Sequence, residues 1–260
     1  MASVIICILA GLIVTDILSF SIYFLSSLFV EEKKDYQKNI DEKYKNSVNS
    51  FFKNKYFKEY MFFIFSEFRN NKKYFLIYYI SLGIITVVIT LFMINFFGFN
   101  IKGILALVFS YSLIVLTFVD AKTQMLPDYV TKPLIVVGLV QGYFSVFADL
   151  KSAVLGAVLG YGILWTINTL FKLARKKDGM GYGDFKLLAA MGAWVGYQYL
   201  PLMILMSSVI GIFVAVAGTK LAEKDISAPT PFGPSLAIAG LVSLCWGDAI
   251  LSWYISLYGY

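Results

Sequence analysis

Long runs of apolar residues, separated by short polar segments, make up most of this chain. The first extends from Ala2 to about Val30, and the others lie at about 75–97, 103–120, 133–148, 152–171, 185–200, 202–219 and 232–257. An α-helix needs about 20 predominantly apolar residues to cross a bilayer, and most of the runs approach that length. The two shortest, 133–148 and 185–200, suit helices that line a cavity enclosed by protein. The pattern predicts an all-α, polytopic membrane protein with about eight transmembrane helices.

One extended polar region divides the chain into three parts. Residues 1–30 are predicted to form a first transmembrane helix, because the run is too long for the apolar core of a signal peptide and lacks a small-residue cleavage site. Residues 31–74 form a basic loop, in which the amphipathic segment 57–68 is expected to lie at the membrane interface. Residues 75–260 are expected to form a transmembrane core.

The distribution of Lys and Arg predicts the orientation. With eight alternating spans, one side of the membrane receives 31–74, 121–132, 172–186 and 220–231, and these segments hold 20 of the 22 Lys and Arg. Basic residues accumulate on the cytoplasmic side, so this side is predicted to be cytoplasmic and both termini extracytoplasmic.

Composition restricts the chemistry. The chain is 59% hydrophobic and 15% charged, which leaves no room for a large soluble domain. It has no histidine, which excludes His-based triads, His metal ligands and H-E-x-x-H zinc hydrolases. The two cysteines, Cys7 and Cys245, lie inside apolar runs and are interpreted as buried packing residues. The Lys and Arg residues that give the net charge of +6 lie at the predicted membrane edges, so nucleic acid is not an expected partner.

Two aspartates mark the candidate site. Asp120 ends the run 103–120, and Asp184 closes a glycine-rich turn containing Gly179, Gly181 and Gly183. A carboxylate at this depth is costly and is by default a functional-site hypothesis. The predicted topology brings both acids to the cytoplasmic face, because one ends the third span and the other begins the sixth.

Two neighbouring carboxylates can carry out proteolysis without metal or histidine. Mutual repulsion prevents both from ionising easily, so the pair shares a proton near neutral pH. The ionised member then takes a proton from water while the other polarises the scissile carbonyl. The glycines allow a sharp turn and the close approach of an extended peptide.

Each acid also has a possible structural role that requires no catalysis. Asp184 is a fair helix N-cap, and Asp128 beside Pro127 is a fair turn residue. Lys186 is expected to support the site by favouring the ionised form of Asp184. Asp16, near the middle of the first run, is interpreted either as a satisfied internal polar group or as a functional one.

Three strings, in order, resemble the signatures of the bacterial type IV prepilin peptidases, which are GxGD aspartyl proteases. They are FVDAKTQMLPDYVTKPL at 118–134, GMGYGDFKLLAAMGAWVG at 179–196 and PFGPSLAIAG at 231–240. The resemblance covers roughly residues 103–257. It implies that Asp120 and Asp184 are catalytic, with Asp128 a structural or substrate-contacting acid.

The resemblance also implies substrates and a location. Members of the family cut the short basic leader from type IV prepilins or type II secretion pseudopilins at the cytoplasmic face of the bacterial inner membrane. Many then methylate the new amino terminus with S-adenosylmethionine. Prepilin or pseudopilin substrates and membrane lipid are therefore the expected partners, and proteolysis itself needs no cofactor.

Two departures from the family pattern concern methylation. Bifunctional members carry two C-x-x-C pairs, thought to hold zinc, in the first cytoplasmic loop, whereas residues 31–73 contain no cysteine. Zinc is therefore not supported there. Where the first span of the family carries G-S-F-L-N, this chain has TDILS at 15–19. The sequence leaves methylation open.

Three alternatives remain. The first is a GxGD protease of the preflagellin or presenilin type with another substrate, against which the L-P-D and P-F-G-P strings argue. The second is a proton-coupled transporter that uses Asp16, Asp120 and Asp184 as a relay, although no inverted repeat is apparent. The third is an inactive membrane scaffold, which the retained signatures disfavour.

Overall fold

A computed structural model describes residues 10–22, 72–176, 179–222 and 231–257. These residues form helices joined by short connections, and no strand occurs among them. The all-α prediction is confirmed. The amphipathic segment 57–68 and the rest of the predicted loop 31–71 lie outside the described residues.

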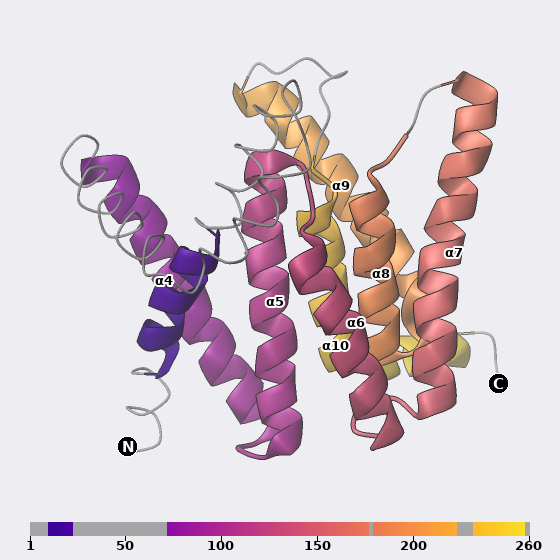
Figure 1. Cartoon of the computed structure of the whole chain (residues 1–260), viewed down its shortest axis with the longest axis horizontal. Coiled ribbons are helices and arrows are strands. Elements are labelled where there is room, and N and C mark those ends of the chain that lie inside the picture. The colour runs from indigo at the N-terminus through magenta and orange to yellow at the C-terminus, as the bar shows by residue number, and fades with distance from the viewer. Residues whose placement is uncertain (1–9, 23–71, 177–178, 223–230, 258–260) are drawn as a thin grey trace, which may run out of the picture. The chain divides into compact units, whose positions relative to one another are not determined.

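Each predicted apolar run has a helix on it. The helices are Ala10–Ile22, α4 (Lys72–Phe97), α5 (Ile101–Thr123), α6 (Asp128–Tyr143), α7 (Leu150–Arg175), α8 (Tyr182–Val195), α9 (Leu200–Ala222) and α10 (Gly233–Ser256), with a short 3-10 helix, η1 (Tyr197–Tyr199), before α9 (Figure 1). Among the described residues, five helical segments are long and apolar enough to cross a membrane, which establishes a polytopic membrane protein. The count of eight spans and the outward orientation of the termini stay predictions.

The largest difference from the predicted boundaries concerns α6. The apolar run predicts a span over 133–148, whereas the helix covers Asp128–Tyr143. It begins after the extended backbone of Pro127 and continues through Pro133. It ends where Phe144 leaves the helix and Ser145 adopts a positive φ of 50°. The apolar residues after the helix thus form a turn, in which the Phe147 N–H donates to the Gln141 side chain at 2.9 Å.

The chain divides into two compact units, Met1–Tyr111 and Ser112–Tyr260. In the first, Tyr79 on α4 donates a hydrogen bond to the Asp16 carboxylate, so Asp16 has a polar partner. Further along α4, the hydroxyls of Thr90 and Tyr111 are hydrogen-bonded at 2.7 Å. These polar pairs satisfy groups that lie in otherwise apolar helices.

The second unit is arranged around α8. This helix packs against α6, α7 and α10, and all of its residues from Asp184 to Val195 except Lys186 are buried. A helix of this length rises only about 21 Å, less than the roughly 30 Å of a hydrocarbon core. Because neighbouring helices surround α8, its shortness exposes no backbone to lipid.

The backbones of α7 and α8 come into direct contact. A Cβ atom added to Gly156 would lie 2.0 Å from the carbonyl oxygen of Gly192, and one added to Gly192 would lie 2.2 Å from that of Gly156. Only two glycines permit this approach. The contact fixes the last turn of α8 against the first two turns of α7, close to the end of the unit where α8 stops.

A network of side-chain hydrogen bonds closes the end of the unit where α8 stops. Tyr199 donates to Asp248 of α10, and the Ser152 hydroxyl of α7 donates to Gln198 at 2.7 Å. Deeper inside, the Trp194 indole donates to the carbonyl of Leu134 at 2.8 Å. We call Ser152, Gln198, Tyr199 and Asp248 the capped end.

Candidate active site

Asp120 lies in the last turn of α5 and is 4% exposed. The apolar residues of α5 that precede Asp120 are packed inside the unit. Asp120 follows them on the same helix and is therefore shielded from water as well. Its Oδ2 accepts a hydrogen bond of 2.9 Å from the backbone N–H of Gly233, the first residue of α10. The end of α5 and the beginning of α10 are joined by this contact.

Asp184 lies in the first turn of α8 and is 7% exposed. The helix begins because Gly181 has an extended backbone, with φ −73° and ψ 141°, and its carbonyl accepts the N–H of Asp184 at 3.1 Å. An acid in the first turn of a helix interacts favourably with the helix dipole. In Figure 1 the end of α5 and the beginnings of α6 and α8 lie at the same end of the second unit, at the top of the view.

The charge of Asp120 affects the pKa of Asp184. Asp184 lies outside the five long apolar segments. Burial and then the negative charge of Asp120 raise its pKa to about 7, against a backbone hydrogen bond from Gly181 that lowers it. Two carboxyl groups that affect each other in this way bind one proton readily and lose it near neutral pH.

The glycine-rich turn is packed closely at two of its three predicted glycines. A Cβ atom on Gly179 would lie 2.7 Å from the ring of Phe171, and one on Gly183 would lie 2.8 Å from Cβ of Leu126. At Gly181 a Cβ atom would meet only the Asp184 carboxylate, at an ordinary 3.6 Å. A side chain at the third position would meet Cβ of Leu126, whereas one at the first position would have to displace the exposed Phe171 ring and one at the second would meet no clash.

Asn168 of α7 binds the backbone of the glycine-rich turn. Its side-chain oxygen accepts the backbone N–H groups of Gly179 at 2.9 Å and of Met180 at 3.2 Å. The Asn168 side chain is buried, at 5% exposed, whereas the turn that it binds is partly open to water. The sequence pattern assigned this residue no part in the site. The only signal was an amide within an apolar run, which does not say what the amide will bind.

Asp128 and Lys186 meet each other. The Lys186 ammonium lies 2.5 Å from one carboxylate oxygen of Asp128, and Lys132 lies 2.8 Å from the other. Although partial burial raises the pKa of Asp128, the hydrogen bonds and charges of both lysines lower it below its ordinary value. The pair joins the start of α6 to the beginning of α8. The ammonium of Lys186 is thus paired with Asp128.

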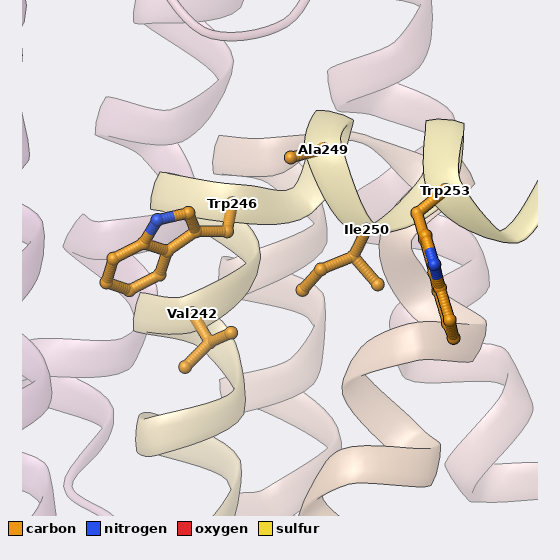
Figure 2. A pocket seen from close by; sticks show the side chains of 5 residues that line it. All are labelled: Val242, Trp246, Ala249, Ile250 and Trp253. Carbon is orange, nitrogen blue, oxygen red and sulfur yellow. The ribbon is translucent and has the colours of Figure 1, made fainter.

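One hollow among the described residues lies on α10 and has almost no polar lining. Val242, Trp246, Ala249, Ile250 and Trp253 line this open hollow of about 310 Å³ (Figure 2). The first of them follows Gly233 by nine residues, so the hollow starts roughly 13 Å along α10 from Gly233. None of the five side chains bears a group for acid–base chemistry, and the two indoles suit a membrane interface.

Within the described residues, no group of three or more His, Cys, Asp or Glu side chains is placed to hold a metal ion. The zinc expectation rests on the segment 31–73, of which residues 31–71 lie outside the described residues, so that expectation stays a prediction.

Comparisons with known proteins agree with the motifs. Residues 107–216 match the type IV leader peptidase family. The chain is 46% identical over 164 residues to a prepilin leader peptidase/N-methyltransferase of Pseudomonas aeruginosa, covering 63% of this chain and 57% of that protein. Proteins of the same name from Aeromonas hydrophila and Legionella pneumophila are 48% identical over 151 residues and 42% identical over 171 residues.

These two matches cover 58% and 66% of this chain, and 52% and 60% of the relatives. The chain thus spans little more than half the length of the curated relatives it matches. No solved structure matches it.

Proposed function

Because residues 107–216 match the type IV leader peptidase family, we propose that this chain is a membrane aspartyl endopeptidase with Asp120 and Asp184 as its catalytic pair. The observation that carries the proposal is the burial of both carboxyl groups at one end of the unit, with the charge of Asp120 acting on Asp184. The proposed substrates are type IV prepilins or type II secretion pseudopilins, because the relatives are named prepilin leader peptidases.

The proposed reaction is hydrolysis of one peptide bond by one water molecule. Asp184 holds the shared proton, consistent with its pKa of about 7. Ionised Asp120 takes a proton from the water as the water oxygen attacks the scissile carbonyl carbon, and Asp184 gives its proton to the carbonyl oxygen. The tetrahedral intermediate then collapses, the C–N bond breaks, and the leaving nitrogen takes the proton from Asp120. One of the two hydroxyl groups of the intermediate gives its proton back to Asp184 as the new carboxyl group forms.

The glycine-rich turn is proposed to face the substrate. Gly179 and Gly181 are exposed, and the turn is held in place by the Asn168 side chain. A substrate held in an extended conformation could then lie beside backbone without meeting side chains. The pair of Asp128 and Lys186 supports this arrangement by joining α6 to α8.

The distribution of Lys and Arg supports an active site at the cytoplasmic face of the bacterial inner membrane. The leader of a single-span substrate would then emerge beside the aspartate pair. Proteolysis by two carboxyl groups requires no cofactor. S-adenosylmethionine enters the proposal only if this chain also methylates the new amino terminus, as the names of its relatives suggest for them.

Cleavage of a purified prepilin by the full chain tests the proposal. We expect Asp120→Asn and Asp184→Asn each to lose cleavage, because neither amide can exchange the required proton. Asp248→Asn is the matched control, since it removes an acid of the same unit at the capped end. It should cleave as the wild type does.

The mass of the product decides the second activity, because methylation adds the mass of one methyl group to the new amino terminus. Cleavage that persists at the wild-type rate in both Asp120→Asn and Asp184→Asn would contradict the proposal. Proton flux by the reconstituted protein would then favour the transporter alternative.

A further inference from the structure

We infer that Gly233 is a positioning residue for the aspartate pair: its backbone N–H orients the Asp120 carboxylate, and its lack of a side chain leaves the space which that carboxylate fills. The inference rests on the proposed function, and it assigns a role to a glycine distant in sequence from both acids. Gly233 belongs to the string PFGPSLAIAG, for which the sequence offered a resemblance and no chemistry.

The start of α10 is suited to binding a carboxylate. The first N–H groups of a helix have no acceptor within the helix, and Pro234, the second residue, has no N–H. The N–H of Gly233 is therefore available, and it donates to Oδ2 of Asp120 in a buried contact. A negative charge at this position also interacts favourably with the helix dipole.

The hydrogen bond distinguishes the two oxygens of Asp120. Oδ2 is engaged by the N–H of Gly233 at 2.9 Å. An N–H can only donate, so Oδ2 serves as acceptor and Oδ1 is left for the attacking water and for the proton shared with Asp184. Orientation of this kind matters because proton transfer requires the acid, the water and the carbonyl to be within hydrogen-bond reach.

Gly233 lacks room for any side chain. A Cβ atom there would lie 2.6 Å from Oδ2, 3.0 Å from Cγ and 3.1 Å from Cβ of Asp120. The atoms in the way are the catalytic carboxylate itself. An alanine would therefore force the carboxyl group to turn or α10 to retreat, and either change removes the hydrogen bond.

A second glycine holds the same face of α10. Gly240 follows Gly233 by seven residues, which returns it to the same side of the helix. A Cβ atom on Gly240 would lie 2.4 Å from the sulfur of Met191 and 3.6 Å from Leu113. Gly240 therefore packs α10 between α8 and α5 without touching an acid, which makes it a matched control.

The experiment measures prepilin cleavage and thermal unfolding of the full chain in detergent. We expect Gly233→Ala to lower kcat by about tenfold or more with little change in KM, because the residue acts on Asp120 and not on substrate binding. Its pH–rate profile should also be displaced. Gly240→Ala should keep the wild-type pH profile, and Gly162→Ala, where a Cβ would meet nothing within 4 Å, should match the wild type throughout.

A double-substitution cycle tests the contact without relying on activity. We expect Gly233→Ala to lower the melting temperature in the wild-type background and to lower it much less beside Asp120→Ala, because the clashing carboxylate is gone. Gly240→Ala should lower it equally in both backgrounds. If Gly233→Ala is recovered from membranes only together with Asp120→Ala, the coupling is shown as well.

The results that overturn the inference are distinct from those that overturn the proposed function. Wild-type kcat in Gly233→Ala, or an equal loss of stability in both backgrounds, would show that Gly233 does not position Asp120. A wild-type protein that cleaves no prepilin would contradict the proposed function itself, and the inference would fall with it.

Discussion

The two ends of the second unit both contain acids, but Asp120 and Asp184 are buried at one end whereas Asp248 is exposed at the other. At the capped end, Asp248 accepts the hydroxyl of Tyr199, a side chain committed to it. At the other end, Asp120 accepts a backbone N–H, and Asp184 is affected by the charge of Asp120. Asp248 therefore has a dedicated side-chain partner, whereas the two neighbouring carboxyl groups at the other end can exchange a proton with a third molecule.

The distance between the ends follows from the helices themselves. Gly233 and Asp248 are 15 residues apart on α10, a rise of about 22 Å. A fold that satisfies its acids at one end with side chains can therefore leave the acids at the other end reactive. The comparison implies that the ends should respond differently to pH and to substitution.

The largest expected difference is in pH dependence. In the proposed reaction Asp184 acts on the carbonyl in its protonated form, and its pKa is about 7. Its protonated fraction is about one half at pH 7 and about one hundredth at pH 9, so kcat should fall about fiftyfold over this range. Cleavage measured across this range by the wild type and by Asp248→Asn should give superimposable profiles. A flat profile would remove the proton-sharing role from Asp184.

Loss of the Asn168 side chain should have the next largest effect. Asn168→Ala leaves the N–H groups of Gly179 and Met180 without their acceptor, and each lost hydrogen bond of this kind contributes about 0.5–1.5 kcal/mol. The turn should loosen, and prepilin cleavage should fall by about tenfold. Asn168→Asp retains an oxygen acceptor and should recover part of the rate. Equal loss in both variants would mean that the amide acts in some other way.

The smallest effect is expected at the capped end. Tyr199→Phe removes the hydroxyl that Asp248 accepts, which should lower the free energy of unfolding by about 1 kcal/mol. Thermal unfolding measures this change, and the cleavage assay should register kcat near the wild-type value. A strong loss of cleavage would show that the two ends are coupled.

The sequence predicted the helices better than the contacts between them. Apolar runs identify helices because lipid and protein interiors impose the same requirement on a buried backbone, so every predicted run carries a helix. The boundary of α6 was predicted wrongly because the prediction followed the apolar run, which begins at residue 133, whereas the helix begins at Asp128 and accommodates Pro133 at its sixth position.

In the candidate site, too, the residues could be predicted from the sequence but the contacts between them could not. The two aspartates could be identified from sequence because an acid beside an apolar run is rare, and counting spans brings both to one side. Gly233 lies 113 residues from Asp120, and no local pattern reveals that they are hydrogen-bonded. Lys186 shows the converse: proximity in sequence suggested a partnership with Asp184, but the side chain turns to Asp128, 58 residues away.

The contact between Gly156 and Gly192 has a consequence for saturation mutagenesis. Any substitution at either position must separate α7 from α8, since the obstacle is a backbone carbonyl and cannot move aside as a side chain would. A screen scored only by processed pilin would rank these glycines with the aspartates, although they lie close to the opposite end of the unit. Scoring the same library for the amount of protein in the membrane would separate them, because the glycine variants should be depleted while the aspartate variants accumulate.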